Sequence, residues 1–245
     1  MSVTDHQSGT HLQEISDGVY RISTPVMLPG DAGAFSFNQY LIDDDEPLLF
    51  HTGLRQLFPA VLDAVTRVMP AQRLRHVAFS HVEADECGAL NQWLAVAPQA
   101  TALCGTVAAM VSVNDLADRP PRPLADGEAL ALGRHTVRWL DAPHLPHAWE
   151  CGFLAEERTG TLFCGDLFTQ PGTGMPALTQ ADILGPSEAF RHNMDYFSHT
   201  PQAGELLEKL ARLRPGTLAC MHGSAWQGDG AGLLRALAAE LARPA

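Results

Sequence analysis

The order of predicted elements occurs twice along this chain of 245 residues, which limits its fold more than any single motif does. Strand-forming runs at 18–24 and 37–53 are followed by alternating helices and strands, beginning with an amphipathic helix at 55–70. Further β-hairpins then precede a second alternation, which ends in a helix at 230–245. We therefore predict one α/β domain over residues 1–245, a four-layer αββα sandwich with helices outside two sheets.

The charge balance excludes several classes of partner. Acidic side chains outnumber basic ones by 28 to 16, and the formal net charge is −12. No basic cluster is present, so we expect neither nucleic acid nor an anionic membrane as a partner. No secretion signal or membrane-spanning run is visible. The five Cys form no C-x-x-C pair, which favours reduced thiols in a cytoplasmic protein.

Four groups of polar residues each follow a predicted strand. They comprise an H-x-E-x-D motif, an H-x-x-H motif, one Asp and one His, with the members His81, Glu83, Asp85, His144, His147, Asp166 and His222. Imidazole and carboxylate groups are the ligand types that transition metals use. Ligands from several strand ends can converge in one cleft at the edge of a sheet, so the sequence predicts a metal site.

These motifs resemble those of the metallo-β-lactamase-fold superfamily. The resemblance extends from about Gly18 to His222 and includes the stretches NQYLI, HTG, LADGEALALG, TLFCGDLF and MHG. It implies a metallo-β-lactamase-like αββα sandwich. Zinc hydrolases of this fold usually carry H-x-H-x-D-H, whereas this chain has Glu83 in place of the second His. The Glu variant is similar to flavodiiron proteins and to standalone oxygen-binding diiron proteins.

The resemblance also implies a division of the ligands between two metal ions. His81, Glu83 and His147 would hold one ion, Asp85 and His222 would hold the other, and Asp166 would bridge them. Three carboxylates make this ligand set oxygen-rich and negative, and one hydroxide would complete neutrality with two divalent ions. Such a set favours iron, with manganese or zinc as alternatives.

Three residues near the motifs have open roles. Glu86 follows H-x-E-x-D, where flavodiiron proteins usually have His. It is an extra ligand, an acceptor for a ligand His, or a first-turn residue favoured by the helix dipole. His144 is the alternative to His147 as a ligand, and the spacing to Asp166 favours His147 and leaves His144 beside the ligands. Glu150 is a further candidate neighbour, because the family has an acid three residues after this His.

The remaining His residues have no predicted ligand role. His51, in HTG, stands where relatives often carry Asp, and we expect it to orient a ligand. His76 is expected to lie in a strand. Five more are expected on the surface, and these are His6, His11, His135, His192 and His199.

The resemblance implies a non-haem diiron protein that binds dioxygen and either senses it or reduces it with electrons from a separate donor protein. Because the chain stops about 23 residues after His222 and contains no phosphate loop to hold FMN, we expect the metal domain alone, without the flavodoxin-like domain. The resemblance further implies a homodimer. The alternative is a dinuclear hydrolase of an ester, thioester, lactone or phosphodiester. Only the fold, which hosts many hydrolases, supports this alternative. A binding module with purely structural metals is a third interpretation, disfavoured because no Cys is among the candidate ligands.

Overall fold

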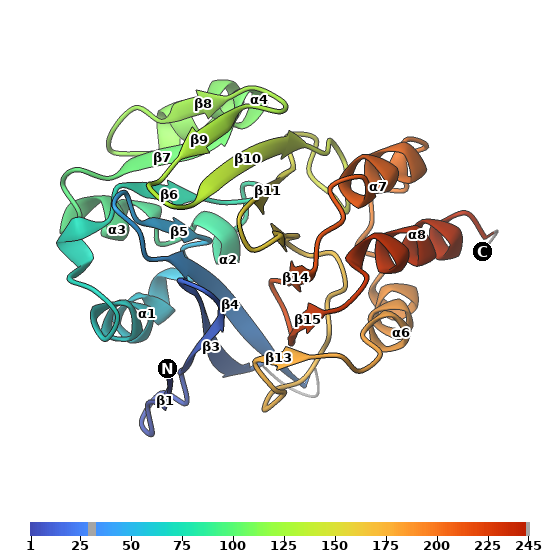
Figure 1. The fold of residues 1–245 in the computed structure, drawn as a ribbon, viewed down its shortest axis with the longest axis horizontal. Coiled ribbons are helices and arrows are strands. Elements are labelled where there is room, and N and C mark those ends of the chain that lie inside the picture. Colours follow the sequence, from blue (N-terminus) through green and yellow to red (C-terminus); the bar gives the residue numbers. More distant parts are fainter. Residues whose placement is uncertain (29–32, 244–245) are drawn as a thin grey trace.

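The computed structural model describes residues 1–28 and 33–243, which form two β-sheets packed face to face. The first sheet has eight strands in sequence order from β1 to β8, and the second has seven in the order β13-β15-β14-β12-β11-β10-β9. Helices cover the outer faces of the two sheets (Figure 1). The predicted αββα sandwich is therefore confirmed.

The first sheet and its helices come from the N-terminal half. Its strands are β1 (Ser2–Thr4), β2 (His11–Ser16), β3 (Val19–Met27), β4 (Ala34–Ile42), β5 (Leu48–Phe50), β6 (His76–Ala78), β7 (Thr101–Gly105) and β8 (Arg122–Leu124). Neighbours from β1 to β5 pair antiparallel, and those from β5 to β8 pair parallel. The helices are α1 (Phe58–Thr66), α2 (Ala84–Cys87), α3 (Leu90–Val96), α4 (Thr106–Ala108) and α5 (Asn114–Leu116), with a π-helical stretch at Ala109–Val113.

The second sheet and its helices come from the C-terminal half. Its strands are β9 (Ala129–Ala131), β10 (Thr136–Asp141), β11 (Gly152–Glu156), β12 (Thr161–Phe163), β13 (Leu178–Thr179), β14 (Thr217–Ala219) and β15 (Ala225–Gln227). The helices α6 (Leu184–Met194), α7 (Ala203–Ala211) and α8 (Gly230–Leu241) lie together on its outer face (Figure 1). Strands β12 and β14 run parallel, and this pairing brings two of the predicted ligand positions side by side.

The core follows from the alternation of side chains along the strands. In β4, Leu41 packs outward against the helices, whereas Tyr40 and Ile42 face the space between the sheets. In β11, Phe153 packs toward the helices and Leu154 toward the other sheet. Both faces of each central strand are buried, so these strands read as nearly continuous apolar runs. Full burial of each Leu or Phe side chain contributes about 1.5–3 kcal/mol to the free energy that stabilises the folded chain.

Four of the described elements were not predicted from the sequence. The polar N-terminus forms β1 and β2, and the Pro-rich stretch 118–128 contributes β8. Pro123 is accommodated there because β8 is the last strand of its sheet, where a missing N–H is tolerated. Helix α6 was not predicted, since its sequence is weakly amphipathic. In the described ranges 1–28 and 33–243, no helix is long and apolar enough to cross a membrane.

Candidate metal centre

The predicted ligands lie where strands of both sheets end. His81 follows β6, Asp166 follows β12 and His222 follows β14. His147 lies in the turn between β10 and β11, and Asp85 lies in the first turn of α2. The carboxyl ends of parallel strands meet at one edge of a sheet, which is why residues distant in sequence converge here.

Four of these side chains form a first compact group. His81, Glu83, His147 and Asp166 each place one nitrogen or oxygen atom within 4.8 Å of the others. The two Nε2 atoms of His81 and His147 are 3.0 Å apart, and each lies 3.1 Å from Oε2 of Glu83. Oδ2 of Asp166 lies 3.3 Å from Nε2 of His147 and 3.6 Å from that of His81. Two nitrogens and two carboxylates thus converge on one point.

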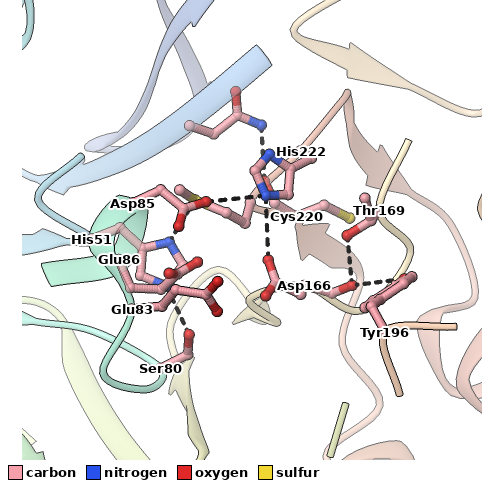
Figure 2. Close-up of polar contacts among 12 residues, drawn as sticks. His51, Ser80, Glu83, Asp85, Glu86, Asp166, Thr169, Tyr196, Cys220 and His222 are labelled. Atoms are coloured by element: carbon pink, nitrogen blue, oxygen red, sulfur yellow. Dashed lines mark hydrogen bonds and ion pairs between the residues drawn. The ribbon is translucent and has the colours of Figure 1, made fainter. Parts of the chain in front are cut away.

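The other carboxylate oxygen of Asp166 faces a second group. Its Oδ1 lies 3.4 Å from Nε2 of His222, which is also 3.4 Å from Oδ2 of Asp85 (Figure 2). Asp166 therefore stands between the two groups and presents one oxygen to each.

Hydrogen bonds to backbone carbonyls set the tautomers of two rings. Nδ1 of His147 lies 3.0 Å from the carbonyl oxygen of Tyr196, and Nδ1 of His222 lies 3.0 Å from that of Ser36. A carbonyl only accepts, so each Nδ1 carries the hydrogen. In its neutral form each ring then directs the lone pair of Nε2 into the centre, which is the state that binds a metal.

The third ring, His81, is oriented by a chain of side chains. The Ser80 hydroxyl lies 2.9 Å from its Nδ1 and 3.0 Å from Nε2 of His51. Nδ1 of His51 in turn contacts the sulfur atom of Met221 at 2.9 Å. Burial lowers the pKa of His51 to about 3, so this ring is neutral at pH 7. The expectation that His51 orients a ligand fits this geometry, with Ser80 as the intermediary.

The electrostatics of the centre favour positive charge. Burial opposes the charged form of His147, but hydrogen bonds to Asp166 and Glu83 outweigh it and raise its pKa to about 10. Asp166 and Asp85 likewise outweigh burial at His222 and raise its pKa to about 10. Hydrogen bonds from His147 and His81 lower the pKa of Glu83 to about 2. A metal cation would displace the protons of the two rings and take over their charge.

Two acidic residues border these groups from within the fold. Glu86 is fully buried, and its Oε2 lies 3.8 Å from Nε2 of His81. Burial, followed by the charges of Asp166 and Asp85, raises the pKa of Glu86 well above its usual range. Glu150 is also buried, and its Oε1 accepts a hydrogen bond of 3.1 Å from the backbone N–H of Val82. Glu150 thereby fixes the loop that carries the H-x-E-x-D motif.

The structure does not place His144 beside these groups. Its side chain is exposed and lines a groove that also contains His192 and His199. Within residues 1–28 and 33–243, it has no hydrogen bond to a predicted ligand. The expected position of His144 was therefore wrong, because the turn before β11 directs His147 inward and His144 outward. Spacing to Asp166 identified His147 as the better ligand candidate, but nothing in the H-x-x-H motif indicates that His144 faces away from the ligands.

Three groups that orient the ligands were not predicted. They are the hydroxyl of Ser80 and the backbone carbonyls of Tyr196 and Ser36. Ser80 could have been found, because it directly precedes His81 and has a hydroxyl group. The carbonyls carry no residue-specific signal. Tyr196 also donates a hydrogen bond of 3.3 Å from its hydroxyl to the backbone carbonyl of Asp166 (Figure 2).

Comparison with known proteins places the chain in a family. Residues 35–223 match the model of a family described as "ODP family beta lactamase". The chain belongs to this family. Relatives include rubredoxin-oxygen oxidoreductase of Megalodesulfovibrio gigas, with 25% identity over 139 residues, and putative diflavin flavoprotein A 1 of Nostoc sp., with 26% over 136. The matches cover 55% and 54% of this chain, and it spans only 34% and 23% of those relatives.

Solved structures share the fold of this family member. The rubredoxin oxygen:oxidoreductase of Desulfovibrio gigas aligns with a TM-score of 0.81 and 18% identity, covering 93% of this chain and 61% of that one. A fragment of putative diflavin flavoprotein A 5 from Nostoc sp. gives 0.81 and 17%, covering 95% and 94%. The flavodiiron protein of Giardia intestinalis gives 0.77 and 22%, covering 94% and 59%. The predicted resemblance to a metallo-β-lactamase-like flavodiiron core is confirmed.

Proposed function

We propose that this protein binds two iron ions and uses them to bind and reduce dioxygen, with electrons from a separate donor protein. The observation that carries the proposal is the position of Asp166, which presents one oxygen to the group containing Glu83 and the other to His222. This geometry supports a dinuclear centre with Asp166 as the bridging ligand. His81, Glu83 and His147 would complete one ion's ligands, and Asp85 and His222 those of the other.

The donor chemistry fits iron. Imidazole suits several transition metals, whereas the carboxylates of Glu83, Asp85 and Asp166 favour harder ions. The buried Oδ1 of Asp166 has no well-formed hydrogen bond in the described part of the chain and faces the candidate ligand His222 at 3.4 Å, as expected for an oxygen that binds a metal. When bound, a pair of iron ions supplies electrons by cycling between the ferrous and ferric states, which zinc does not do.

The surrounding residues define how a small molecule reaches the centre. The side chains of His81 and Asp166 are 1% and 8% exposed, so they form the buried side of the candidate metal centre. Those of Glu83 and His147 are 54% and 25% exposed, so they mark the side open to solvent. Dioxygen needs no large cavity, and four electrons and four protons convert it to two molecules of water.

The relatives support this choice over hydrolysis. One is named rubredoxin-oxygen oxidoreductase, and that name states both an electron donor and an oxidant for that protein. For the present chain, a rubredoxin is accordingly the first donor protein to test. The Glu at position 83 also departs from the pattern of zinc hydrolases, which supports redox chemistry.

The test is anaerobic loading of the purified protein with iron, followed by addition of reduced rubredoxin and air. We expect a visible absorption band and continuous consumption of oxygen. A variant with His147→Ala should lose both, and one with His144→Ala should keep both. A protein that holds two iron ions but neither consumes oxygen nor changes its absorption would contradict the proposal. Turnover of esters or lactones by zinc-loaded protein would then support the hydrolase instead.

A further inference from the structure

The guanidinium group of Arg21 is a buried positive charge without an adjacent negative one. Arg21 lies on β3, and only 2% of it is exposed. Among the described residues it forms no ion pair with a carboxylate, and its Nε has no hydrogen-bond partner. Burial lowers the pKa of Arg21, yet a guanidinium group stays charged in proteins. Because burial of a lone charge is costly, a negative charge elsewhere in the fold must compensate it.

Arg21 contacts the turn that follows β14. Its Nη2 donates a hydrogen bond of 2.6 Å to the backbone carbonyl of Gly223. Nδ2 of Asn38 donates to the same carbonyl at 2.8 Å and to that of Cys220 at 2.9 Å. The hydroxyl of Tyr40 also donates to the carbonyl of Cys220, at 2.7 Å. Three side chains of β3 and β4 therefore hold this turn, and Arg21 alone among them is charged.

The nearest negative charge connected to this turn is in the candidate metal centre. His222 directly precedes Gly223, and its Nε2 lies 3.4 Å from both Oδ2 of Asp85 and Oδ1 of Asp166. The guanidinium group is thus linked to these carboxylates through one backbone unit and one imidazole ring. In the described part of the chain, no Lys or Arg forms an ion pair with a candidate ligand. Arg21 therefore acts on the second group as a buried charge that salt screens little.

We propose that the charge of Arg21 favours the lower oxidation state of the metal ion held by Asp85, Asp166 and His222. The inference rests on the dinuclear centre of the proposed function but not on its reaction with dioxygen. A positive charge repels a trivalent ion more than a divalent one, because the repulsion grows with the charge of the ion. At a separation of roughly 10 Å and an effective dielectric constant of about 20, the ferrous-to-ferric ratio changes on the order of 10-fold. Arg21 thereby makes this ion easier to reduce.

The first test is a redox titration of the iron-loaded protein, followed by electron paramagnetic resonance. Arg21→Gln keeps a donor for the turn but removes the charge. At a given potential it should shift the ferrous-to-ferric ratio about 10-fold toward ferric, which is about 59 mV for one electron. Tyr40→Phe removes a hydrogen bond to the same turn without changing its charge, and should leave the ratio unchanged. Arg212→Met, which removes an exposed charge from the end of α7, should also leave it unchanged.

The second test replaces iron with ions of fixed charge. Ga³⁺ is trivalent like ferric iron and Mn²⁺ is divalent like ferrous iron, so their competition for the same ligands reports charge rather than ligand position. Free Mn²⁺ is measured by electron paramagnetic resonance. Relative to the natural protein, Arg21→Gln should favour Ga³⁺ over Mn²⁺ about 10-fold more strongly, and Tyr40→Phe should not. Circular dichroism reports folding, and Arg21→Met replaces Arg21→Gln in both tests if the latter is unfolded.

The outcomes separate this inference from the proposed function. The inference is overturned if a folded neutral variant of Arg21 leaves either ratio unchanged, if Tyr40→Phe shifts them equally, or if the natural protein binds no metal. A protein that shows the Ga³⁺/Mn²⁺ shift but does not hold iron would contradict only the proposed function. The same holds for an iron-loaded protein that shows the redox shift but fails to consume oxygen.

Discussion

The hydroxyl of Ser80 lies 2.9 Å from Nδ1 of His81 and connects this ring to the buried His51. The direction of the hydrogen bonds is determined by the sulfur atom of Met221, which accepts and does not donate. Neutral His51 therefore donates from Nδ1 to the sulfur and accepts from Ser80 at Nε2. Ser80 in turn accepts from Nδ1 of His81, so the Nε2 lone pair of His81 faces the metal centre.

Ser80→Ala should weaken the binding of the first metal ion by about 10- to 100-fold, since groups that orient a ligand His have effects of this size. It also leaves two buried ring nitrogens without a partner, which costs about 1–3 kcal/mol of folding free energy. Isothermal titration calorimetry with Mn²⁺ measures the first effect, and urea unfolding of the metal-free protein measures the second. Ser198→Ala, at an exposed position, is the control. Unchanged metal affinity in Ser80→Ala would show that the contact does not orient His81.

The turn between β10 and β11 contains a matched pair for testing ligation. His147→Ala removes a ring that lies 3.0 Å from His81, and we expect it to release one metal ion per chain. His144→Ala removes an exposed ring three residues earlier and should leave the metal content unchanged. Inductively coupled plasma mass spectrometry of the purified variants gives the metal-to-protein ratio. The assignment fails if the two variants exchange these outcomes or both retain two ions.

The metal-free protein should lose stability as the pH rises above neutrality. The pKa values of His147 and His222 are raised from 6.5 to about 10 in the folded chain. A group whose pKa is higher in the folded chain than in the unfolded chain stabilises the folded state. This stabilisation is complete below the unfolded-state pKa of 6.5 and is lost as the pH rises through about 10. The melting temperature of the metal-free protein should therefore fall between pH 6.5 and 10. Metal-loaded protein should show a much smaller fall, because the cation replaces the protons, and equal falls would contradict this account.

Local sequence signals predicted most of the helices and strands and the types of ligand, but not the groups that orient the ligands. The alternation in β4 and the motif around His81 are both readable from neighbouring residues. The carbonyl of Ser36 that orients His222 is 186 positions away in sequence, and that of Tyr196 is 49 positions from His147. Any residue supplies a backbone carbonyl, so only the folded chain shows which ones serve this purpose.

His135, in the core, also shows what local sequence cannot predict. Its position in a hairpin, next to Gly133 and Arg134, favours a surface residue, and that prediction was wrong. The ring is fully buried, with Nδ1 3.1 Å from Oε1 of an equally buried Glu156 on β11. The ring also closely approaches Gly18, where an added Cβ would meet its Nε2 at 3.0 Å. This burial depends on a loop from the other sheet, which local sequence cannot reveal.

The burial of His135 leads to a stability prediction that is independent of the metal centre. His135→Ala leaves a cavity and removes the neighbour of a buried carboxylate, so we expect a loss of about 2–4 kcal/mol in unfolding free energy. Glu156 retains hydrogen bonds from the backbone N–H groups of Arg158 and Thr159, which limits the cost. His6→Ala, at an exposed position, should change stability by less than about 0.5 kcal/mol. Urea unfolding of the metal-free variants measures both values. Metal content should be unchanged in each, because His135 lies in the turn before β10 and the ligand-bearing turn follows the other end of that strand. A loss of metal would contradict this separation.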